Sequence, residues 1–211
     1  MKLAVAAIVK NEVDCLPEWL AYHRLVGVSQ FLIADNSSND GTRELLAACN
    51  DVILKDVVTK NGEPPQLAAY EYLLKTCPAD IDVLAFIDAD EFILPVQSDD
   101  ERQEKPPSIL PWLESCFSDE SVGAVALNWA CFGSSGEVFR EPGLVIERFT
   151  SRSYINFGPN HHYKSIVRPT DVLGFDNPHH VRLKHGRYVN ALGDPLKSRI
   201  AQDGTRRVGL S

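Results

Sequence analysis

The sequence predicts an α/β fold in which a mixed sheet is flanked by helices. In the first half of the 211-residue chain, short apolar runs alternate with helical patterns, as in a parallel sheet wound by right-handed crossovers. The unbroken apolar run 83–87 indicates a strand that is buried on both faces. Three carboxylates follow within four residues, at the edge of the sheet where such folds bind ligands: Asp88, Asp90 and Glu91.

The first half of the chain supplies the predicted parallel strands and the helices between them. Leu3 to Val9 is an apolar strand that ends at a polar turn. Pro17 suits the first turn of the following helix, and Gly27 stops it. The small polar residues 35–42 mark a tight turn into a second helix. The remaining elements expected here are strands at 31–34, 52–54 and 83–87 and helices at 43–49 and 66–75.

In the second half, apolar runs follow one another without long helices between them. A charged loop at 98–108 leads into a short helix at 109–117. We expect strands at 122–132, 144–149 and 164–168. These strands predict a mixed or antiparallel extension that closes over the sheet.

Residues 1–180 are predicted to form one domain, followed by a basic segment at 181–211. This segment holds seven basic and two acidic residues, which is a net charge of +5 (7 − 2). We expect it to be peripheral to the fold, and either partly disordered or truncated. If the segment is functional, its expected target is an acidic membrane surface or another anionic partner.

The composition is that of a soluble globular protein, with 44% apolar and 24% charged residues. A net charge of −8 argues against a nucleic-acid binder. The five cysteines form no C-x-x-C pair, which suits reduced thiols in the cytosol and offers no zinc site. The first apolar run is at the short limit for a signal peptide, and no run is long enough to span a membrane. We therefore expect a cytoplasmic protein, with peripheral contact to the inner membrane surface through 181–211.

Polar segments at the ends of the predicted strands carry a family resemblance. The first three are Lys10-Asn11-Glu12, the turn 35–42 and Asp88-Ala89-Asp90-Glu91. Together with the segments 128–136, 164–169 and 177–180, they resemble the nucleotide-diphospho-sugar glycosyltransferases of the GT-A fold, specifically the family 2-like branch close to family 92. The resemblance covers residues 3–181. A D-x-D pair alone is weak, whereas these segments in this order are fairly specific.

The resemblance implies a metal-dependent, inverting transfer of a sugar from a UDP- or GDP-sugar to a hydroxyl of a glycan or other acceptor. Bound Mn²⁺ or Mg²⁺ would stabilise charge developing on the diphosphate. Asp90 is the expected metal ligand, with Asp88 nearer the ribose or reaching the metal through water. His179 matches the family's metal histidine, and His180 is the reserve. The alternatives are a solvated turn of acids and, for the histidines, ordinary surface residues.

The resemblance also places a nucleotide pocket at the first two strand ends. Asn11 and Glu12 line this pocket, and Asp35 stands where the family holds the base or ribose. Asp40 and Gln66, the latter in a loop at 62–66, complete the expected set. Turn formation and helix capping are the alternative roles for Asn11, Glu12, Asp35 and Asp40.

Other polar and aromatic residues have weaker assignments. Lys164 and Arg168 share one face of a strand, so both are candidates for phosphate contacts, with cross-strand salt bridges as the alternative. Inversion needs a general base, and Glu147 is the candidate. His23 is expected to be packed in the core. Further acceptor-side or core candidates are Trp129, Phe132, the turn 133–136, His161 and His162.

Two further functions remain open from the sequence. An apolar strand ending in D-x-D can present an aspartyl nucleophile, as in haloacid dehalogenase-type phosphohydrolases. That family usually places this strand first, whereas here it is the fourth. The other alternative is a nucleotide-binding module that keeps the fold without turnover, which the absence of an evident base motif would permit.

Overall fold

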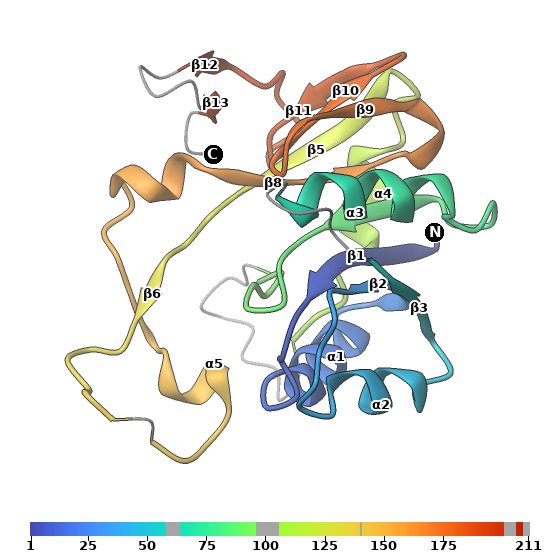
Figure 1. Cartoon of the computed structure of the whole chain (residues 1–211). Helices are drawn as coiled ribbons and strands as arrows, with labels where there is room; N and C mark the ends of the chain where they lie inside the picture. Colours follow the sequence, from blue (N-terminus) through green and yellow to red (C-terminus); the bar gives the residue numbers. More distant parts are fainter. Residues whose placement is uncertain (58–63, 96–105, 140, 201–205, 209–211) are drawn as a thin grey trace.

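The computed structural model describes residues 1–57, 64–95, 106–139, 141–200 and 206–208 and has a seven-stranded mixed sheet at its centre (Figure 1). The strand order is β11-β5-β8-β4-β1-β2-β3. Four strands run parallel: β1 (Leu3–Val9), β2 (Val28–Asp35), β3 (Val52–Asp56) and β4 (Val83–Phe86). The predicted α/β fold with a mixed sheet is therefore confirmed.

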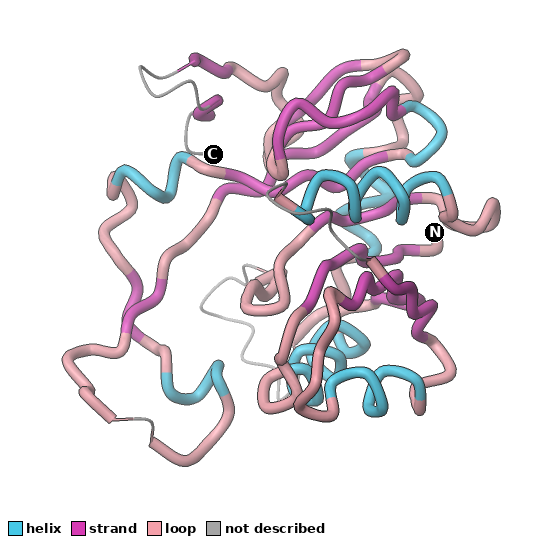
Figure 2. The backbone as a smooth tube through the Cα atoms, viewed as in Figure 1, coloured by secondary structure: helices cyan, strands magenta, loops and turns pink. Residues whose placement is uncertain are grey.

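Helices cover both faces of this sheet, so its central strands are buried on both sides (Figure 2). Along β1, Leu3, Val5, Ala7 and Val9 face one core, and Ala4 and Ala6 face the other, as the alternation of a strand requires. The first core contains residues of α1 (Leu16–Leu25), α2 (Thr42–Ala47) and α4 (Leu110–Cys116). The second is covered by α3 (Pro65–Lys75).

The second half of the chain widens the sheet rather than closing over it. β8 (Tyr163–Val167) lies between β4 and β5 (Val122–Asn128) and runs antiparallel to both. After the 3-10 turn η2 (Pro169–Asp171), a hairpin of β9 (Val172–Asn177) and β10 (His180–Leu183) packs on the α3 face. The predicted mixed extension is present, but its main strands are members of the central sheet.

The segment predicted as peripheral contributes to the central sheet. β11 (Arg187–Val189) pairs in parallel with β5, and Val189 is fully buried. Residues 187–189 are therefore structural, which corrects the predicted boundary at 180 for this part of the segment. A separate two-stranded sheet follows, formed by β12 (Ser198–Ile200) and β13 (Arg206–Val208).

Residues 129–161, which we call the arm, connect β5 to β8 and project from the sheet (Figure 1). The arm carries β6 (Phe132–Gly133), α5 (Val145–Arg148), β7 (Ser151–Arg152) and the 3-10 turn η1 (Gly158–His161). The strand predicted at 144–149 is wrong, because residues 145–148 of this stretch form the helix α5. Instead, Glu18 of α1 accepts hydrogen bonds from the N–H groups of Val145 and Ile146 at 2.6 and 3.0 Å.

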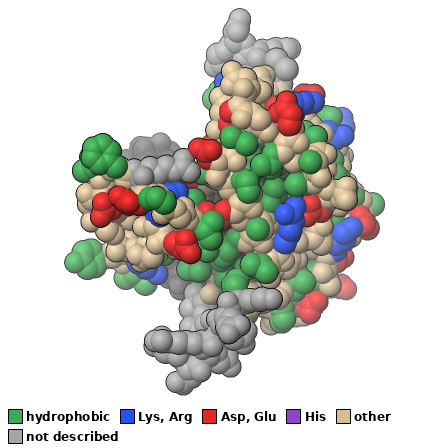
Figure 3. All heavy atoms as spheres, turned by 90° about the horizontal axis from the view of Figure 1, so that it is seen from below, with side chains coloured by type: hydrophobic (Ala, Val, Ile, Leu, Met, Phe, Trp, Pro, Cys, Tyr) green, Lys and Arg blue, Asp and Glu red, His purple; other side chains and the backbone are tan. Residues whose placement is uncertain are grey.

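Many of the exposed large hydrophobic side chains lie on the arm, which is the lobe at the left of Figure 3. At its base, the buried side chain of Asn160 accepts the N–H of Cys131 at 3.0 Å and donates to the carbonyl of Tyr154 at 2.9 Å. Asn160 thus links the two ends of the arm to each other, and Glu18 attaches α5 of the arm to α1. The exposed arm residues are Phe132, Val138, Phe139, Leu144, Ile146, Tyr154, Ile155 and Phe157.

Two further expectations concern cysteines and membranes. All five cysteines are free thiols, as their spacing predicted. Within the described residues, no helix has the length and hydropathy needed to cross a membrane.

Candidate functional site

The carboxyl ends of β1, β2 and β4 bring most of the predicted site residues together. β1 lies between β4 and β2, so the strand order reverses direction at the β1–β4 boundary. This boundary is the position at which open α/β sheets bind their ligands. Asp88 and Asp90 follow β4, Asn11 and Glu12 follow β1, and Asp35 ends β2.

Asp88 is the centre of a hydrogen-bonded cluster drawn from three elements. Its Oδ2 accepts from the Nζ of Lys164 on β8 at 2.7 Å. Its Oδ1 accepts from Gln66 Nε2 at 2.7 Å and from the Tyr70 hydroxyl at 3.1 Å, both on α3. The Lys164 side chain is only 4% exposed, whereas that of Asp88 is 34% exposed. A buried ammonium therefore fixes a carboxylate that remains partly open to a ligand.

Glu91 joins the same cluster because the chain turns immediately after β4. The Glu91 N–H donates to the Asp88 carbonyl at 3.1 Å, and the Glu91 carboxylate accepts the Asp88 N–H at 2.8 Å. The strand ends at Phe86, so strand alternation does not govern these side chains, and the Glu91 carboxylate reaches Lys164 at 3.5 Å. Burial raises the pKa of Glu91 to about 7, against the lowering effect of Lys164.

The loops after β1 and β2 are joined by side-chain to backbone hydrogen bonds. Asn11, in the left-handed region with φ of 58°, accepts the Asn39 N–H through its side chain at 2.9 Å. Asp40 accepts the N–H groups of Val13 at 3.2 Å and Thr42 at 3.0 Å. These contacts give Asn11 and Asp40 the turn-forming role that the sequence left as an alternative. They also hold the two loops in a fixed relation beside Asp90.

The site is electronegative at these two loops. The pKa of Glu12 is raised by burial and by the nearby charges of Asp90 and Asp40. Asp35 is 3% exposed, and its carboxylate accepts the Ser38 N–H at 3.3 Å. The Arg43 guanidinium lies 3.7 Å from the Asp35 carboxylate and is also paired with Asp56. An anionic ligand at this edge therefore needs additional positive charge.

His179 lies on the Lys164 side of the site, at the turn between β9 and β10. Its Nδ1 is 3.1 Å from the Tyr163 carbonyl, which can only accept, so Nδ1 carries the proton and Nε2 keeps its lone pair. Burial lowers the pKa of His179 to about 4, with further lowering by Lys164 and His162. The rings of Trp129 and His162 lie 5.3 and 5.6 Å from the His179 ring. A neutral imidazole is thus held next to the Asp88 cluster.

Three predicted residues are engaged elsewhere. The His180 Nδ1 lies 2.6 Å from the Tyr163 hydroxyl, and because Tyr163 and Lys164 are successive strand residues, His180 is on the opposite face from Asp88. Arg168 donates to the Val122 carbonyl at 3.0 Å, so it is structural rather than a phosphate contact. Glu147 lies on α5 and accepts the N–H of Leu144 at 3.0 Å, which is a capping interaction within its own turn.

Two side chains of this site were missed or misplaced by sequence reasoning. Tyr70 was not predicted, although it lies four residues after Gln66 and therefore on the same helix face. Glu91 was identified only as a member of the acidic run, and its contacts with the Asp88 N–H and with Lys164 were not predicted. His23 is fully buried, as predicted, and burial lowers its pKa to about 4.

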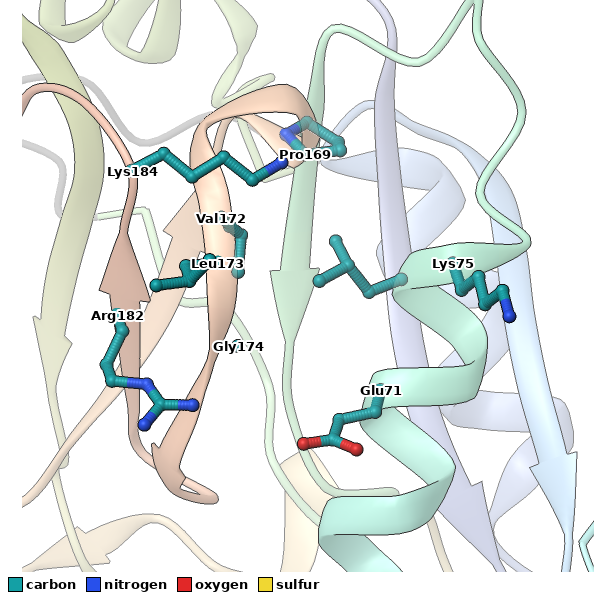
Figure 4. Close-up of a pocket in the computed structure, with 9 residues that line it drawn as sticks. Glu71, Lys75, Pro169, Val172, Leu173, Gly174, Arg182 and Lys184 are labelled. Atoms are coloured by element: carbon teal, nitrogen blue, oxygen red, sulfur yellow. The ribbon is translucent and has the colours of Figure 1, made fainter.

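A groove of about 430 Å³ lies between α3 and the β9–β10 hairpin, away from these residues (Figure 4). Arg182 and Glu71 line it from opposite sides, and Gly174 leaves room for the Arg182 guanidinium. Gln66 and Lys75, at opposite ends of α3, are separated by roughly 13 Å at 1.5 Å per residue. None of the residues that line the groove contacts Asp88, so the groove is distinct from the Asp88 site within the part of the chain that the structure describes.

Comparisons with known proteins agree with the family resemblance. A glycosyltransferase family 92 protein of Ricinus communis is 31% identical over 198 residues, covering 90% of this chain and 33% of the relative. A family 92 protein of Oryza sativa subsp. japonica is 30% identical over 199 residues, covering 89% of this chain and 31% of the relative. The chain thus spans about a third of the length of these relatives. No protein-family model matches the chain.

Among solved structures, that of S. aureus TarS gives a TM-score of 0.50 at 16% identity, covering 81% of this chain and 29% of TarS. At this identity the likeness concerns the fold alone, and it confirms the GT-A fold expected from the motifs. Over its own length, the chain is a relative of the proteins of glycosyltransferase family 92.

Proposed function

We propose that this chain carries the nucleotide-sugar site of a metal-dependent, inverting glycosyltransferase. The donor is a UDP- or GDP-sugar, and the acceptor is a hydroxyl of a glycan or another molecule. The observation that carries the proposal is the Asp88–Asp90 turn at the reversal point of the strand order, backed by Lys164 and His179. The names of the family 92 relatives support the reaction class.

The charge of the site supports metal dependence. A nucleoside diphosphate is anionic, and it would approach Glu12, Asp35, Asp88 and Asp90. The negative charges of the diphosphate and of these carboxylates repel one another unless a cation lies between them. Lys164 is already paired with Asp88 and Glu91, so a divalent ion would supply the positive charge that the diphosphate needs beside these carboxylates. When bound, such an ion stabilises negative charge that develops on the leaving diphosphate.

The donor set fits a metal that is shared between protein and ligand. Within the described residues, no group of three or more His, Cys, Asp or Glu side chains is placed to hold an ion unaided. Mg²⁺ typically takes one or two protein carboxylates and completes its shell with phosphate oxygens and water. Asp90, which is exposed, and the Nε2 of the neutral His179 are the two residues that would hold the ion. Imidazole together with carboxylate suits Mn²⁺.

The remaining site residues bind and orient the donor. Asp88, held by Lys164, Gln66 and Tyr70, presents its partly exposed carboxylate to the ribose. Asn11, Glu12, Asp35 and Asp40 line the base and ribose side. The acceptor approaches from the arm, where aromatic side chains are exposed.

A ligand-binding screen tests the proposal directly. UDP, GDP, CDP and dTDP are each added with and without Mn²⁺, and the thermal unfolding midpoint is measured. A ligand that binds only the native state stabilises it by about 2.7 kcal/mol at 100 times its Kd. We expect one diphosphate to raise the midpoint by several degrees in the presence of Mn²⁺ and to have little effect without it.

The two alternative functions give different results in the same experiment. Hydrolysis of a phosphate monoester without sugar transfer would favour the phosphohydrolase. Stabilisation by a diphosphate, with neither transfer nor hydrolysis of the sugar nucleotide, would single out a binding module. A folded protein that responds to none of the four diphosphates would overturn the proposal.

Glu147 provides a separate prediction about the general base. Because its carboxylate caps α5, we expect Glu147→Gln to retain transfer activity within about twofold, since a lost general base costs about 100-fold or more. Initial rates of sugar transfer measure this. A 100-fold loss with unchanged diphosphate binding would restore Glu147 as the base, and the anomeric configuration of the product would report inversion.

A further inference from the structure

The segment that follows Asp90 has no strand or helix to satisfy its backbone. Residues 91–95 have no regular secondary structure, although Ile93 is buried. Buried backbone N–H and C=O groups need partners, because leaving one unpaired costs about 1–3 kcal/mol. In this protein the partners are side chains of α1, a helix that lies some 70 residues earlier in the chain.

Three residues on one face of α1 provide these contacts. We call Trp19, Tyr22 and His23 the α1 clamp. The Trp19 indole N–H donates to the Glu91 carbonyl at 2.8 Å. The Tyr22 hydroxyl donates to the Ile93 carbonyl at 3.1 Å, and the Ile93 N–H donates to His23 Nε2 at 3.3 Å.

The clamp residues are themselves fixed by packing. Trp19 and His23 are fully buried, and Tyr22 is 7% exposed. His23 Nδ1 lies 2.8 Å from the Trp19 carbonyl, which assigns the proton to Nδ1 and leaves Nε2 as the acceptor for Ile93. The Phe92 ring stacks on His23 at 5.9 Å and meets Tyr22 edge-on at 5.1 Å. Each clamp side chain therefore has one well-defined orientation.

We infer that the α1 clamp positions the Asp88–Asp90 turn for the donor and its metal. This inference rests on the proposed function. The turn has two fixed ends: Lys164, Gln66 and Tyr70 hold Asp88, and the clamp holds the backbone directly after Asp90. The Asp90 side chain itself is exposed, so its position depends on the backbone on either side of it. Trp19, Tyr22 and His23 are positioning residues, since they act through the backbone rather than on the ligand.

Substitutions at His23 test the inference. His23→Leu keeps a side chain of comparable size but removes the acceptor for the Ile93 N–H, whereas His23→Gln can supply an amide oxygen in its place. We expect His23→Leu to raise the Kd for Mn²⁺, measured with UDP and with the diphosphate selected by the screen, by about 10- to 100-fold, as seen for supporting residues around metal ligands. His23→Gln should recover part of this affinity. Tyr22→Phe should weaken binding in the same direction, and it is the variant to use if His23→Leu does not fold.

Trp112→Phe is the matched control for a loss of stability alone. The Trp112 indole on α4 also donates to a distant backbone carbonyl, that of Ala191, at 3.1 Å. Its substitution removes the same kind of contact far from the turn, so the unfolding midpoint should fall without a change in the Kd for Mn²⁺. A Trp112→Phe effect on the Kd as large as that of His23→Leu would overturn the positioning role.

Amide hydrogen exchange at Ile93 separates this inference from the proposed function. In the wild type this amide is bonded to His23, so we expect its exchange to be slow, and to accelerate in His23→Leu more than in Trp112→Phe. Wild-type protein that binds no Mn²⁺–diphosphate would overturn the proposed function whatever the exchange data show. Wild-type binding together with an unchanged Kd in folded His23→Leu would overturn the clamp alone.

Discussion

Asp90→Asn is expected to abolish the Mn²⁺-dependent binding of a nucleoside diphosphate while leaving the fold intact. The side chain is exposed and follows the end of β4, so its loss removes little packing. The amide keeps the shape but loses the charge that a divalent ion requires. Since an ion of this kind contributes several kcal/mol to catalysis, we expect transfer to fall by about 1,000-fold. Isothermal titration with Mn²⁺ and the diphosphate, together with initial rates, measures both effects.

Asp80→Asn is the control for this substitution. Asp80 is an exposed carboxylate that pairs with Lys2, beyond the end of α3 and away from the site. Asp80→Asn changes the net charge by the same amount as Asp90→Asn. It therefore separates the effect of losing a charge at the site from the effect of a change in net charge. Metal-dependent binding that survives in folded Asp90→Asn would rule out Asp90 as the metal ligand.

Lys164→Met is expected to have the largest effect on stability of the substitutions considered. It removes a 4% exposed ammonium that lies 2.7 Å from Asp88 and 3.5 Å from Glu91. Breaking a buried ion pair on one side typically costs about 3–5 kcal/mol, because the remaining charge is left without compensation. The partial exposure of Asp88 places the expected loss near the lower limit, about 3 kcal/mol at pH 8. Urea unfolding measures it.

The pH dependence of this loss follows from the pKa of Glu91. Its native-state pKa of about 7 lies above the ordinary glutamate pKa of 4.5, so its stabilising contribution is complete below pH 4.5 and is lost as the pH rises through 7. Without Lys164 this pKa rises further, and the pKa of His179, which Lys164 lowers, rises as well. As the pH falls, both changes stabilise the folded Lys164→Met variant relative to the folded wild type. The difference in unfolding free energy should therefore shrink between pH 8 and pH 5.5.

Lys184→Met is the matched control. Lys184 is exposed, and its Nζ donates to the backbone carbonyl of Thr170 at 3.4 Å. Surface substitutions of this kind change stability by about 0.5 kcal/mol or less. A Lys164→Met loss that is the same at pH 8 and pH 5.5 would contradict the assigned link between Lys164 and Glu91.

The parallel half of the fold could be predicted from the sequence because its signal is local. Buried parallel strands are continuous apolar runs, and polar residues appear where each strand ends. The observed β1, β3 and β4 therefore begin at the predicted residues, and α1 and α3 lie within a residue or two of their predicted bounds. The same locality explains why Asp88, Asp90 and Glu12 were identified as neighbours from their places at strand ends.

The second half could not be predicted to the same degree, because its structure depends on distant partners. The stretch 144–149 has the apolar content of a strand, yet Glu18 of α1 supplies acceptors for the first N–H groups of a helix there. β11 is short, and its place in the sheet depends on pairing with β5. Neither partner is evident from the local sequence.

The positions of His179 and His180 also depend on partners that are distant in the sequence. The Asn177 side chain accepts the N–H groups of both His179 and His180, at 2.9 and 3.0 Å, and so shapes the hairpin turn. The Tyr163 carbonyl then binds one ring and the Tyr163 hydroxyl binds the other. The sequence ranked His179 before His180 only by resemblance, whereas the contacts with Tyr163 separate the two side chains.

The arm joins the central sheet at a single strand pair, so it is a natural site for a loop replacement. β5 and β8 are antiparallel neighbours, and Asn128 at the end of one pairs with Tyr163 at the start of the other. The whole arm leaves and re-enters the sheet through this one pair. A tight turn between the two strands would therefore preserve the register of the sheet and every contact of Asp88. Under the proposed function, grafting a different arm at this junction would replace the residues on the acceptor side while keeping the contacts of Asp88 with Lys164, Gln66 and Tyr70.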